Sequence, residues 1–468
     1  MSASAFEGFL STPRMLALFE PASVVQAMMD FEAALAKAQA EEGVIPQAAA
    51  VAIAGVCKAQ LYDVSAIVGA SGRAGSLAIP LVKQLTHTVS LFSPEAAGFV
   101  HWGSTSQDVI DTGMALVTRR ALALIDRDLG VLIGGLLQLA QAHGDAPVLA
   151  RTLLQPAQVV SFGFKLVEWI APLVRSRERL RASGQAALQL QLGGAVGTLA
   201  VMGDKGLPVA QRVAQALQLR LPAGAWHTQR DEVVSLACEV GILAGVLGKI
   251  GKDISLMSQG EIGEVAEPSG GGRGGSSAMP HKRNPVASMV ALAASIRAPH
   301  RVSAILSSMA QEHERGLGNW QAELAETAGL YISVHGSLAA LADVAGGLQV
   351  DRERMLANID SLQGLVFAEA VSMRLAAKLG KARAHSMLEQ LSQEVIANHR
   401  HLRDAVLQAV QDDESLRGQF EAADIAALFD AQRAAQRAVT VAQPQLDTLN
   451  ASAQQQAASA PWSAWLDD

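Results

Sequence analysis

The middle of the chain carries a regular pattern of apolar and polar positions. Apolar side chains recur at alternating spacings of three and four residues in four segments, 122–139, 162–173, 233–257 and 331–341. This spacing places one apolar seam along a helix, as packing in a near-parallel helix bundle requires. The pattern therefore predicts a central bundle of helices of roughly 25–35 residues each.

The third of these segments is interrupted by glycines, which lower helix propensity. They are Gly241, Gly245, Gly248 and Gly251. We expect close approach of a neighbouring helix to offset this cost. Long seams of this kind also suggest oligomerisation, because one chain does not easily cover every apolar face.

The two ends of the chain predict shorter helices. Pro21 begins one that ends near 43–46, and others lie around Gly380 and Asp412. The fold class is therefore all-α, a central bundle of long helices flanked by two smaller helical domains. The expected domains are 1–110, 111–350 with a glycine-rich loop at 268–285, and 351–468. The last ~30 residues are low in complexity, and we expect them to be weakly ordered and to carry no chemistry.

Composition excludes several classes of protein. The 468 residues are 50% apolar and 17% charged, which is too little charge for a disordered chain. A net charge of −7 argues against a nucleic-acid partner. No run approaches ~18 uninterrupted apolar residues, so we expect no membrane partner. Cys57 and Cys238 stand far apart, which disfavours a disulfide framework and a thiolate zinc site. These features, with an N-terminus unlike a secretory signal, predict a cytoplasmic protein.

The most unusual segment is 268–285, PSGGGRGGSSAMPHKRNP. Gly270, Gly272 and Gly275 satisfy GxGxxG, but a bundle helix precedes them where a dinucleotide site needs a strand. A flexible linker is an alternative for the glycines alone. Hydroxyls beside cations and a glycine hinge favour a lid that closes over an anion.

The chain resembles the fumarase/aspartase superfamily in three segments. Residues 275–285 match its GSSxMPxKxNP motif, 101–112 (HWGSTSQDVIDT) resemble its first conserved region, and 151–163 (RTLLQPAQVVSFG) its second. The resemblance covers nearly the whole chain. It implies a fumarase/aspartase-like all-α fold, addition to or elimination from a carbon next to a carboxylate, and no cofactor or metal. It also implies a homotetramer with active sites shared between subunits.

Within this superfamily the chain is most similar to the bacterial 3-carboxy-cis,cis-muconate cycloisomerases. The segments 31–46, 226–231 and 311–318 carry this similarity. It implies lactonisation of a small tricarboxylate in protocatechuate (β-ketoadipate) degradation. Adenylosuccinate lyase or another fumarate-releasing lyase is the alternative, and a non-catalytic homologue kept for its fold is another. The second region lacks the lyases' histidine, since Leu153 follows Thr152, and Pro156 stands where some cycloisomerases have one.

The resemblance assigns catalysis to Ser276, as general acid/base, and to Lys282. Asn284 and Lys282 would bind a substrate carboxylate and the developing negative charge, with Ser277 in the same set. A serine needs stabilisation of its alkoxide to act this way. Ser277 is equally a candidate to cap the next helix.

The remaining candidates are donors for substrate carboxylates. Hydroxyls and backbone N–H groups at a helix N-terminus bind carboxylates, and the arginine fork binds two oxygens. The structural alternatives are helix capping, a structural histidine and surface ion pairs. The set comprises His101, Ser104, Thr105, Ser106, Arg151, Thr152, Gln155, Gln229, Arg230 and Arg315.

Overall fold

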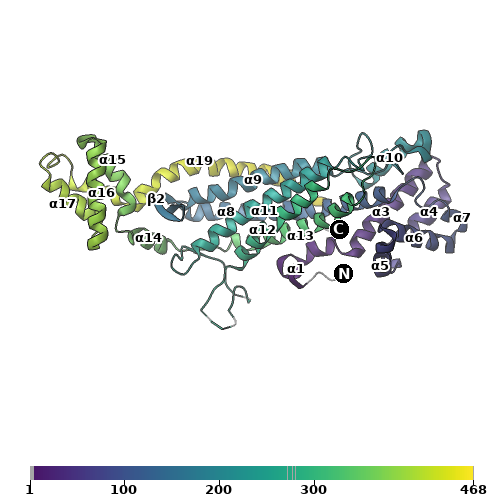
Figure 1. Cartoon of the computed structure of the whole chain (residues 1–468), viewed down its shortest axis with the longest axis horizontal. Helices are drawn as coiled ribbons and strands as arrows, with labels where there is room; N and C mark the ends of the chain where they lie inside the picture. The colour runs from purple at the N-terminus through teal and green to yellow at the C-terminus, as the bar shows by residue number, and fades with distance from the viewer. Residues whose placement is uncertain (1–4, 271, 277, 280, 467–468) are drawn as a thin grey trace.

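The computed structural model describes residues 5–270, 272–276, 278–279 and 281–466. It is an elongated, mostly helical molecule with a long bundle in the middle and a smaller group of helices at each end (Figure 1). Ser277, one of the predicted substrate contacts, lies outside the described residues. The predicted all-α class is confirmed.

Long helices form the bundle, and each of the four predicted seams lies in one of them. Their lengths run from 22 to 38 residues. The bundle helices are α8 (Ser106–His143), α9 (Phe162–Ala187), α11 (Asp231–Met257), α12 (Val286–Ser307), α13 (Asn319–Ala345) and α19 (Ala431–Ala458).

The N-terminal helices pack against one end of the bundle, chiefly through α3 on α8. Pro21 begins α3, as predicted, because proline is favoured in the first helical turn. The elements at this end are α1 (Ala5–Leu10), α2 (Pro13–Leu18), α3 (Pro21–Glu41), α4 (Gln47–Val56), η1 (Ala59–Leu61), α5 (Val64–Ala74), α6 (Ala78–Phe92), α7 (Pro94–Ala97), η2 (Ala200–Lys205) and α10 (Gly206–Leu217).

The C-terminal helices at the opposite end have a core of their own, which includes Val371, Leu388 and Val406. These elements are α14 (Arg352–Asp360), η3 (Leu365–Phe367), α15 (Ala368–Leu379), α16 (Lys381–Asn398), α17 (Leu402–Asp412), α18 (Ala422–Ala426) and η4 (Ala427–Phe429). Gly380 separates α15 from α16, where its φ of 77° suits a residue without a Cβ.

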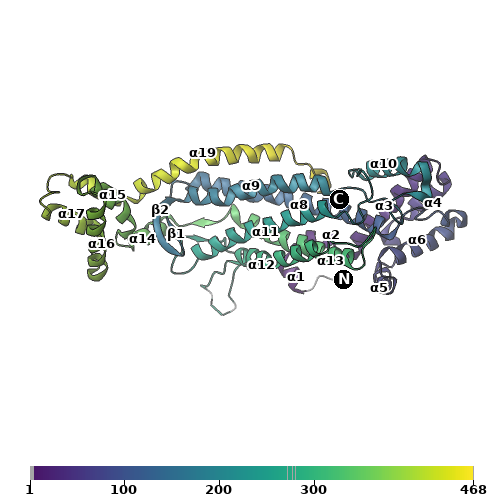
Figure 2. The same ribbon diagram turned by 45° about the horizontal axis from the view of Figure 1, so that its top comes forward.

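Two short antiparallel pairs of strands complete the described chain. β1 (Pro147–Thr152) pairs with β2 (Gln155–Ser161), with Thr152 opposite Gln155 and a register shift between Ala150 and Arg151. β3 (Val265–Ala266) pairs with β4 (Gln349–Val350). The β1–β2 hairpin lies at the end of the bundle that faces the C-terminal helices (Figure 2).

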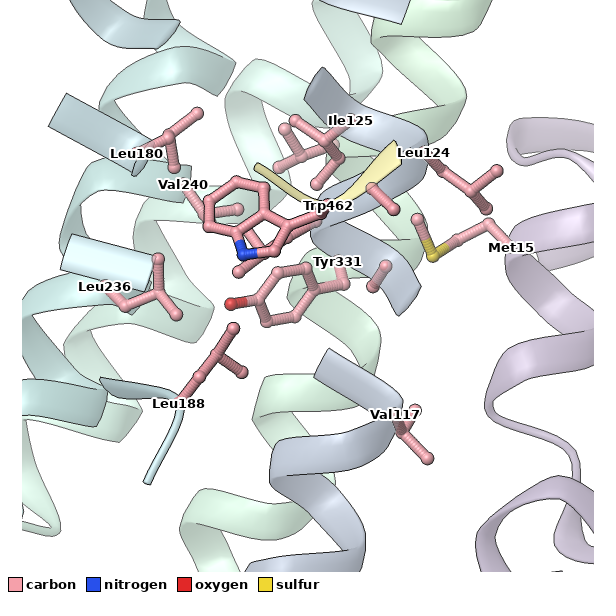
Figure 3. Packing of buried hydrophobic residues seen from close by; sticks show 14 of the residues in the cluster. Met15, Val117, Leu124, Ile125, Leu180, Leu188, Leu236, Val240, Tyr331 and Trp462 are labelled. Carbon is pink, nitrogen blue, oxygen red and sulfur yellow. The ribbon is translucent and has the colours of Figure 1, made fainter. Parts of the chain in front are cut away.

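The seam residues are the core of the bundle. Tyr331 and Trp462 pack among aliphatic side chains from α8, α9 and α11 (Figure 3). Three of the four glycines of α11 face α12: an added Cβ would lie 2.6 Å from Val302 at Gly241, 2.4 Å from Ser295 at Gly248 and 2.9 Å from Ala291 at Gly251. Gly245 meets nothing within 4 Å, so the close-approach explanation does not apply to it.

The C-terminal segment differs from its expected weak order. Residues 431–458 form one helix, α19, which packs along α9 and includes the glutamine run 454–456 (Figure 2). Beyond it Trp462 is only 5% exposed. The segment is ordered because one face of α19 is buried: Ala442 and Leu446 pack in the bundle core, and Ala435 packs with Leu149 and Val159 of the β1–β2 hairpin.

Two core helices are more apolar than expected. By length and composition, α11 and α13 would each suffice to cross a membrane. Within their most apolar windows, however, 50% and 67% of the residues are buried inside the molecule. Core helices of a large bundle have this composition because they are surrounded by other helices.

Candidate active site

The first conserved region forms a turn that leads into α8. His101 has a φ of 59° and Gly103 a φ of 72°, so the chain turns sharply before Thr105. α8 begins at Ser106, because Thr105 and Asp108 form a capping box. Ser104, Thr105 and Ser106 are half-buried at this helix N-terminus, where backbone N–H groups and the helix dipole favour an anion.

A buried contact between His101 and Glu32 of α3 joins this turn to the N-terminal helices. The Nδ1 of His101 lies 2.5 Å from Oε1 of Glu32, a side chain of α3 that is 1% exposed. Burial by itself would lower the pKa of His101, but the charge and hydrogen bond of Glu32 outweigh it, so the pKa is raised above its ordinary value. The charged ring is therefore favoured.

Asp108 organises the backbone around the turn. Its buried carboxylate accepts hydrogen bonds from the N–H of Thr105 (3.1 Å) and of Gly194 (2.9 Å), and lies 2.8 Å from Nε2 of His227. Sequence reasoning missed Asp108, His227 and Glu32 as parts of the site. The Thr-x-x-Asp capping pattern was a signal for Asp108, whereas nothing local marks Glu32.

Arg315 joins this group from a distant part of the chain. Its Nη1 donates to the Thr105 hydroxyl over 2.7 Å. The segment that carries Arg315 joins the end of α12 to the start of α13, where Trp320 donates from Nε1 to Asp111 in the first turns of α8 (2.8 Å). The structure thus brings together five of the predicted residues: His101, Ser104, Thr105, Ser106 and Arg315.

Arg230 is close to this group, but it is buried and already paired with carboxylates of the same chain. The side chain is 2% exposed and lies between Asp111 and Glu323, to which it donates from Nη1 (2.8 Å) and Nε (3.0 Å). These carboxylates raise its pKa despite the burial. These contacts favour the alternative of an ion pair that stabilises the fold over the predicted contact with substrate. Gln229 next to it is exposed, and its amide donates to the carbonyl of Ala225 at 3.2 Å.

The second conserved region forms the β1–β2 hairpin. Arg151 makes a two-pronged ion pair with Glu264, whose side chain is fully buried, over 3.0 and 2.7 Å. The fork of Arg151, a predicted contact for a substrate carboxylate, is therefore bound to a carboxylate of the same chain, which favours the ion-pair alternative. Thr152 and Gln155 are exposed at the tip of the hairpin, where Leu153 and Leu154 between them are 97% and 73% exposed.

The glycine-rich segment forms a loop that projects from the bundle between α11 and α12 (Figure 1). The backbone N–H of Asn284 donates to the Gly274 carbonyl over 2.9 Å, and this hydrogen bond closes the base of the loop. Above this base the Ser276 hydroxyl accepts from the N–H of Met279 at 3.1 Å. Lys282 is exposed, and with Asn284 it lines a cleft against β3 and the start of α14.

The predicted residues therefore form two groups at opposite ends of the bundle. The first group (His101, Ser104, Thr105, Ser106 and Arg315) lies at the N-terminus of α8. The second group (Thr152, Gln155, Ser276, Lys282 and Asn284) lies on the hairpin and loop near its C-terminus. The 38 residues of α8 span about 57 Å. A small substrate does not reach both groups of one chain.

Comparison with known families accounts for most of the chain. A family model described as lyase matches residues 10–299, and one described as adenylosuccinate lyase C-terminus matches 364–443. The chain belongs to the lyase family of fumarase and aspartase. The family match includes the first conserved region, the hairpin and the loop.

Curated members of this lyase family are similar over most of their length. The 3-carboxy-cis,cis-muconate cycloisomerase of Bradyrhizobium diazoefficiens is 48% identical over 90% of this chain and 92% of its own length. That of Pseudomonas putida is 47% identical over 86% and 96%. The crystal structure of the 3-carboxy-cis,cis-muconate lactonizing enzyme from Pseudomonas putida superposes with a TM-score of 0.90, at 42% identity, over 97% of this chain and 100% of that chain.

In the part of this lyase that the structure describes, no group of three or more His, Cys, Asp or Glu side chains is placed to hold a metal ion. The polar groups gathered at the α8 N-terminus are instead hydroxyls, an arginine and a histidine whose pKa Glu32 raises. Such donors suit a substrate rich in carboxylates.

Proposed function

We propose that the chain is a 3-carboxy-cis,cis-muconate cycloisomerase, which converts its substrate to 4-carboxymuconolactone. The observation that carries this proposal is a sequence identity of 47–48% to two cycloisomerases over 86–90% of the chain. Adenylosuccinate lyase, the alternative, is a more distant member of the family. The two cycloisomerases compared above are bacterial metabolic enzymes, and we propose a cytoplasmic location for this chain.

The reaction explains why the candidate residues are donors and cations. A carboxylate oxygen of the substrate attacks the diene within the same molecule, and the electron pair moves toward another carboxylate to form an enolate-like anion. A proton then bonds to the carbon next to that carboxylate, so one proton is taken up for each ionised substrate. The attacking group is already tethered, and the main task of the enzyme is to stabilise the anion.

Each group of residues has a role in this scheme. The α8 N-terminus, with Thr105 and Arg315, binds substrate carboxylates. Ser276 is the acid–base group at the reacting carbon, and Lys282 and Asn284 stabilise the negative charge that develops there. The loop above the Gly274–Asn284 contact closes over the substrate and excludes water.

We also propose a homotetramer in which active sites are shared between subunits. Enzymes of this family are typically oligomeric. The separation of the two groups along α8 supports sharing, because another chain must then supply the second group. Apolar side chains on the outer faces of α11 and α12 support contact between copies: Ile242, Met289, Ile296 and Leu306 are 46%, 44%, 67% and 47% exposed.

The activity is tested with purified protein and 3-carboxy-cis,cis-muconate. We expect loss of the conjugated-diene absorbance without added cofactor and in the presence of EDTA. Adenylosuccinate in a parallel cuvette should stay intact. A stable diene beside cleavage of adenylosuccinate would favour the alternative, and no reaction with either would reopen the non-catalytic reading.

Sharing of sites is tested by mixing inactive variants. Arg315→Ala alters the first group and Ser276→Ala the second, and each should be nearly inactive alone. Refolded together in equal amounts, they should regain up to about a quarter of wild-type activity, because about one site in four receives both intact groups. A mixture of Ser276→Ala and Lys282→Ala is the matched control and should stay inactive. Equal recovery in both mixtures, or in neither, would contradict sharing between the two groups.

A further inference from the structure

Glu32 is a buried carboxylate that neither the sequence motifs nor the proposed roles above include. It lies on α3, a helix of the N-terminal end, and its side chain is 1% exposed. Its Oε1 contacts Nδ1 of His101 at 2.5 Å. Its Oε2 is buried and has no hydrogen-bond partner among the described residues. A buried carboxylate with only one hydrogen-bond partner lowers the stability of the fold, so a functional role for Glu32 is worth seeking.

The surroundings hold the His101 ring in one place. His101 has a left-handed backbone conformation, with a φ of 59°. Seven residues after Glu32 on the same helix, Gln39 donates to the carbonyl of Trp102 over 2.6 Å. α3 thus contacts the turn at two places, the side chain of His101 and the backbone carbonyl of Trp102.

The contact also determines where the protons of the ring lie. An ionised carboxylate only accepts hydrogen bonds, so Nδ1 carries the proton. Nε2 has no protein partner in the described part of the chain and remains for a ligand. The charged groups that face the ring are Glu32 from α3 and Asp108 from α8, and both favour its protonated form.

We propose that Glu32 is a positioning residue of the reaction, which fixes the orientation of His101 and favours its doubly protonated form, so that Nε2–H donates to a carboxylate of the bound substrate. The inference rests on the proposed function and deepens it. The enolate-like anion places extra charge on a substrate carboxylate, and a fixed charged donor binds that state more strongly than the ground state. Without Glu32 the ring would be neutral over more of the working pH range and free to rotate.

The test is the pH dependence of kcat/KM in Glu32→Gln. The variant keeps the shape of the side chain and removes its charge. Activity that needs protonated His101 falls as pH rises through the pKa of the ring. We call this fall at high pH the basic limb of the profile. In Glu32→Gln we expect it to move to lower pH by about one unit, because a neighbouring opposite charge shifts a pKa by an amount of this order. Glu32→Asp should restore part of the shift.

Two controls separate positioning from a structural role. Gln39→Met removes the other contact between α3 and the turn without a change of charge, so it should lower stability and leave the basic limb in place. In a His101→Gln background, Glu32→Gln should have no further effect on kcat/KM. An unmoved limb, or an equal loss of activity with and without His101, would overturn the inference.

A second measurement does not depend on turnover. Diethyl pyrocarbonate reacts with the neutral imidazole, and peptide mass mapping follows its reaction with His101 across pH. The half-maximal rate should occur at lower pH in Glu32→Gln than in wild type. A wild-type protein that does not turn over the muconate would refute the proposed function, whereas identical His101 profiles in the two proteins would refute the role of Glu32.

Discussion

Arg315 donates a hydrogen bond to the hydroxyl of Thr105 over 2.7 Å, although 210 positions separate the two residues in the chain. The contact joins the segment between α12 and α13 to the N-terminus of α8. A guanidinium and a helix N-terminus at one place form a stronger carboxylate site than either alone.

Arg315→Lys should therefore impair catalysis without unfolding the protein. Lysine keeps the charge but lacks the planar fork that binds two oxygens. We expect kcat/KM to fall about 10- to 100-fold, as for the loss of a charged hydrogen bond. Steady-state kinetics with the muconate measures this. Arg374→Lys, in an exposed ion pair with Asp424, is the control and should match wild type. An unchanged kcat/KM in Arg315→Lys would remove this arginine from the site.

Arg230→Met should destabilise the fold. Removal of the guanidinium leaves Asp111 and Glu323 buried without their cation, which typically costs about 3–5 kcal/mol. Urea denaturation measures the free energy of unfolding. The control Arg383→Met breaks an exposed pair with Asp413 and should cost at most about 1 kcal/mol. Normal stability with lost activity would instead return Arg230 to the substrate contacts.

The lowered pKa of Asp126 predicts a specific dependence of stability on pH. Burial would raise the pKa of this carboxyl, but hydrogen bonds from Arg181 and Arg177 outweigh it and lower the pKa below its ordinary value of 3.8. A lowered folded-state pKa stabilises the protein above the unfolded-state pKa, and this contribution is lost as pH falls through the folded value.

Asp126→Asn should thus lose stability at pH 7 and show a weaker loss below about pH 4 than wild type. Thermal unfolding from pH 3 to pH 7 is the measurement. Asp404→Asn serves as control, since Asp404 is in an exposed pair with Arg403. Parallel stability curves for wild type and Asp126→Asn would show that Asp126 does not contribute in this way.

Substitution of Trp462 tests whether the C-terminal segment packs on the bundle. The indole lies against Gly184, where an added Cβ would be 2.7 Å from the ring. Trp462→Ala leaves a large cavity and should cost about 3–5 kcal/mol in the free energy of unfolding. Met373→Ala, at a side chain that is 64% exposed, is the control and should have little effect. A negligible change in Trp462→Ala would support the weakly ordered tail that the sequence suggested.

The sequence predicted the long helices and the family well, because both depend on local patterns. Spacings of three and four residues place apolar side chains on one helix face whatever packs against them. The loop motif at 275–285 is likewise a contiguous pattern. The tail was misjudged because low complexity and alanine content are compatible with a helix once a bundle offers a face to bury it.

The sequence by itself determined the helical architecture, the family and the residues that carry its motifs. The tertiary structure decided what each of those residues contacts. Arg230 and Arg315 are both predicted carboxylate contacts, yet one is held by Asp111 and Glu323 and the other lies at Thr105. The difference depends on burial and on partners tens to hundreds of positions away. Such contacts arise only when the helices pack, so spacing along the chain does not reveal them.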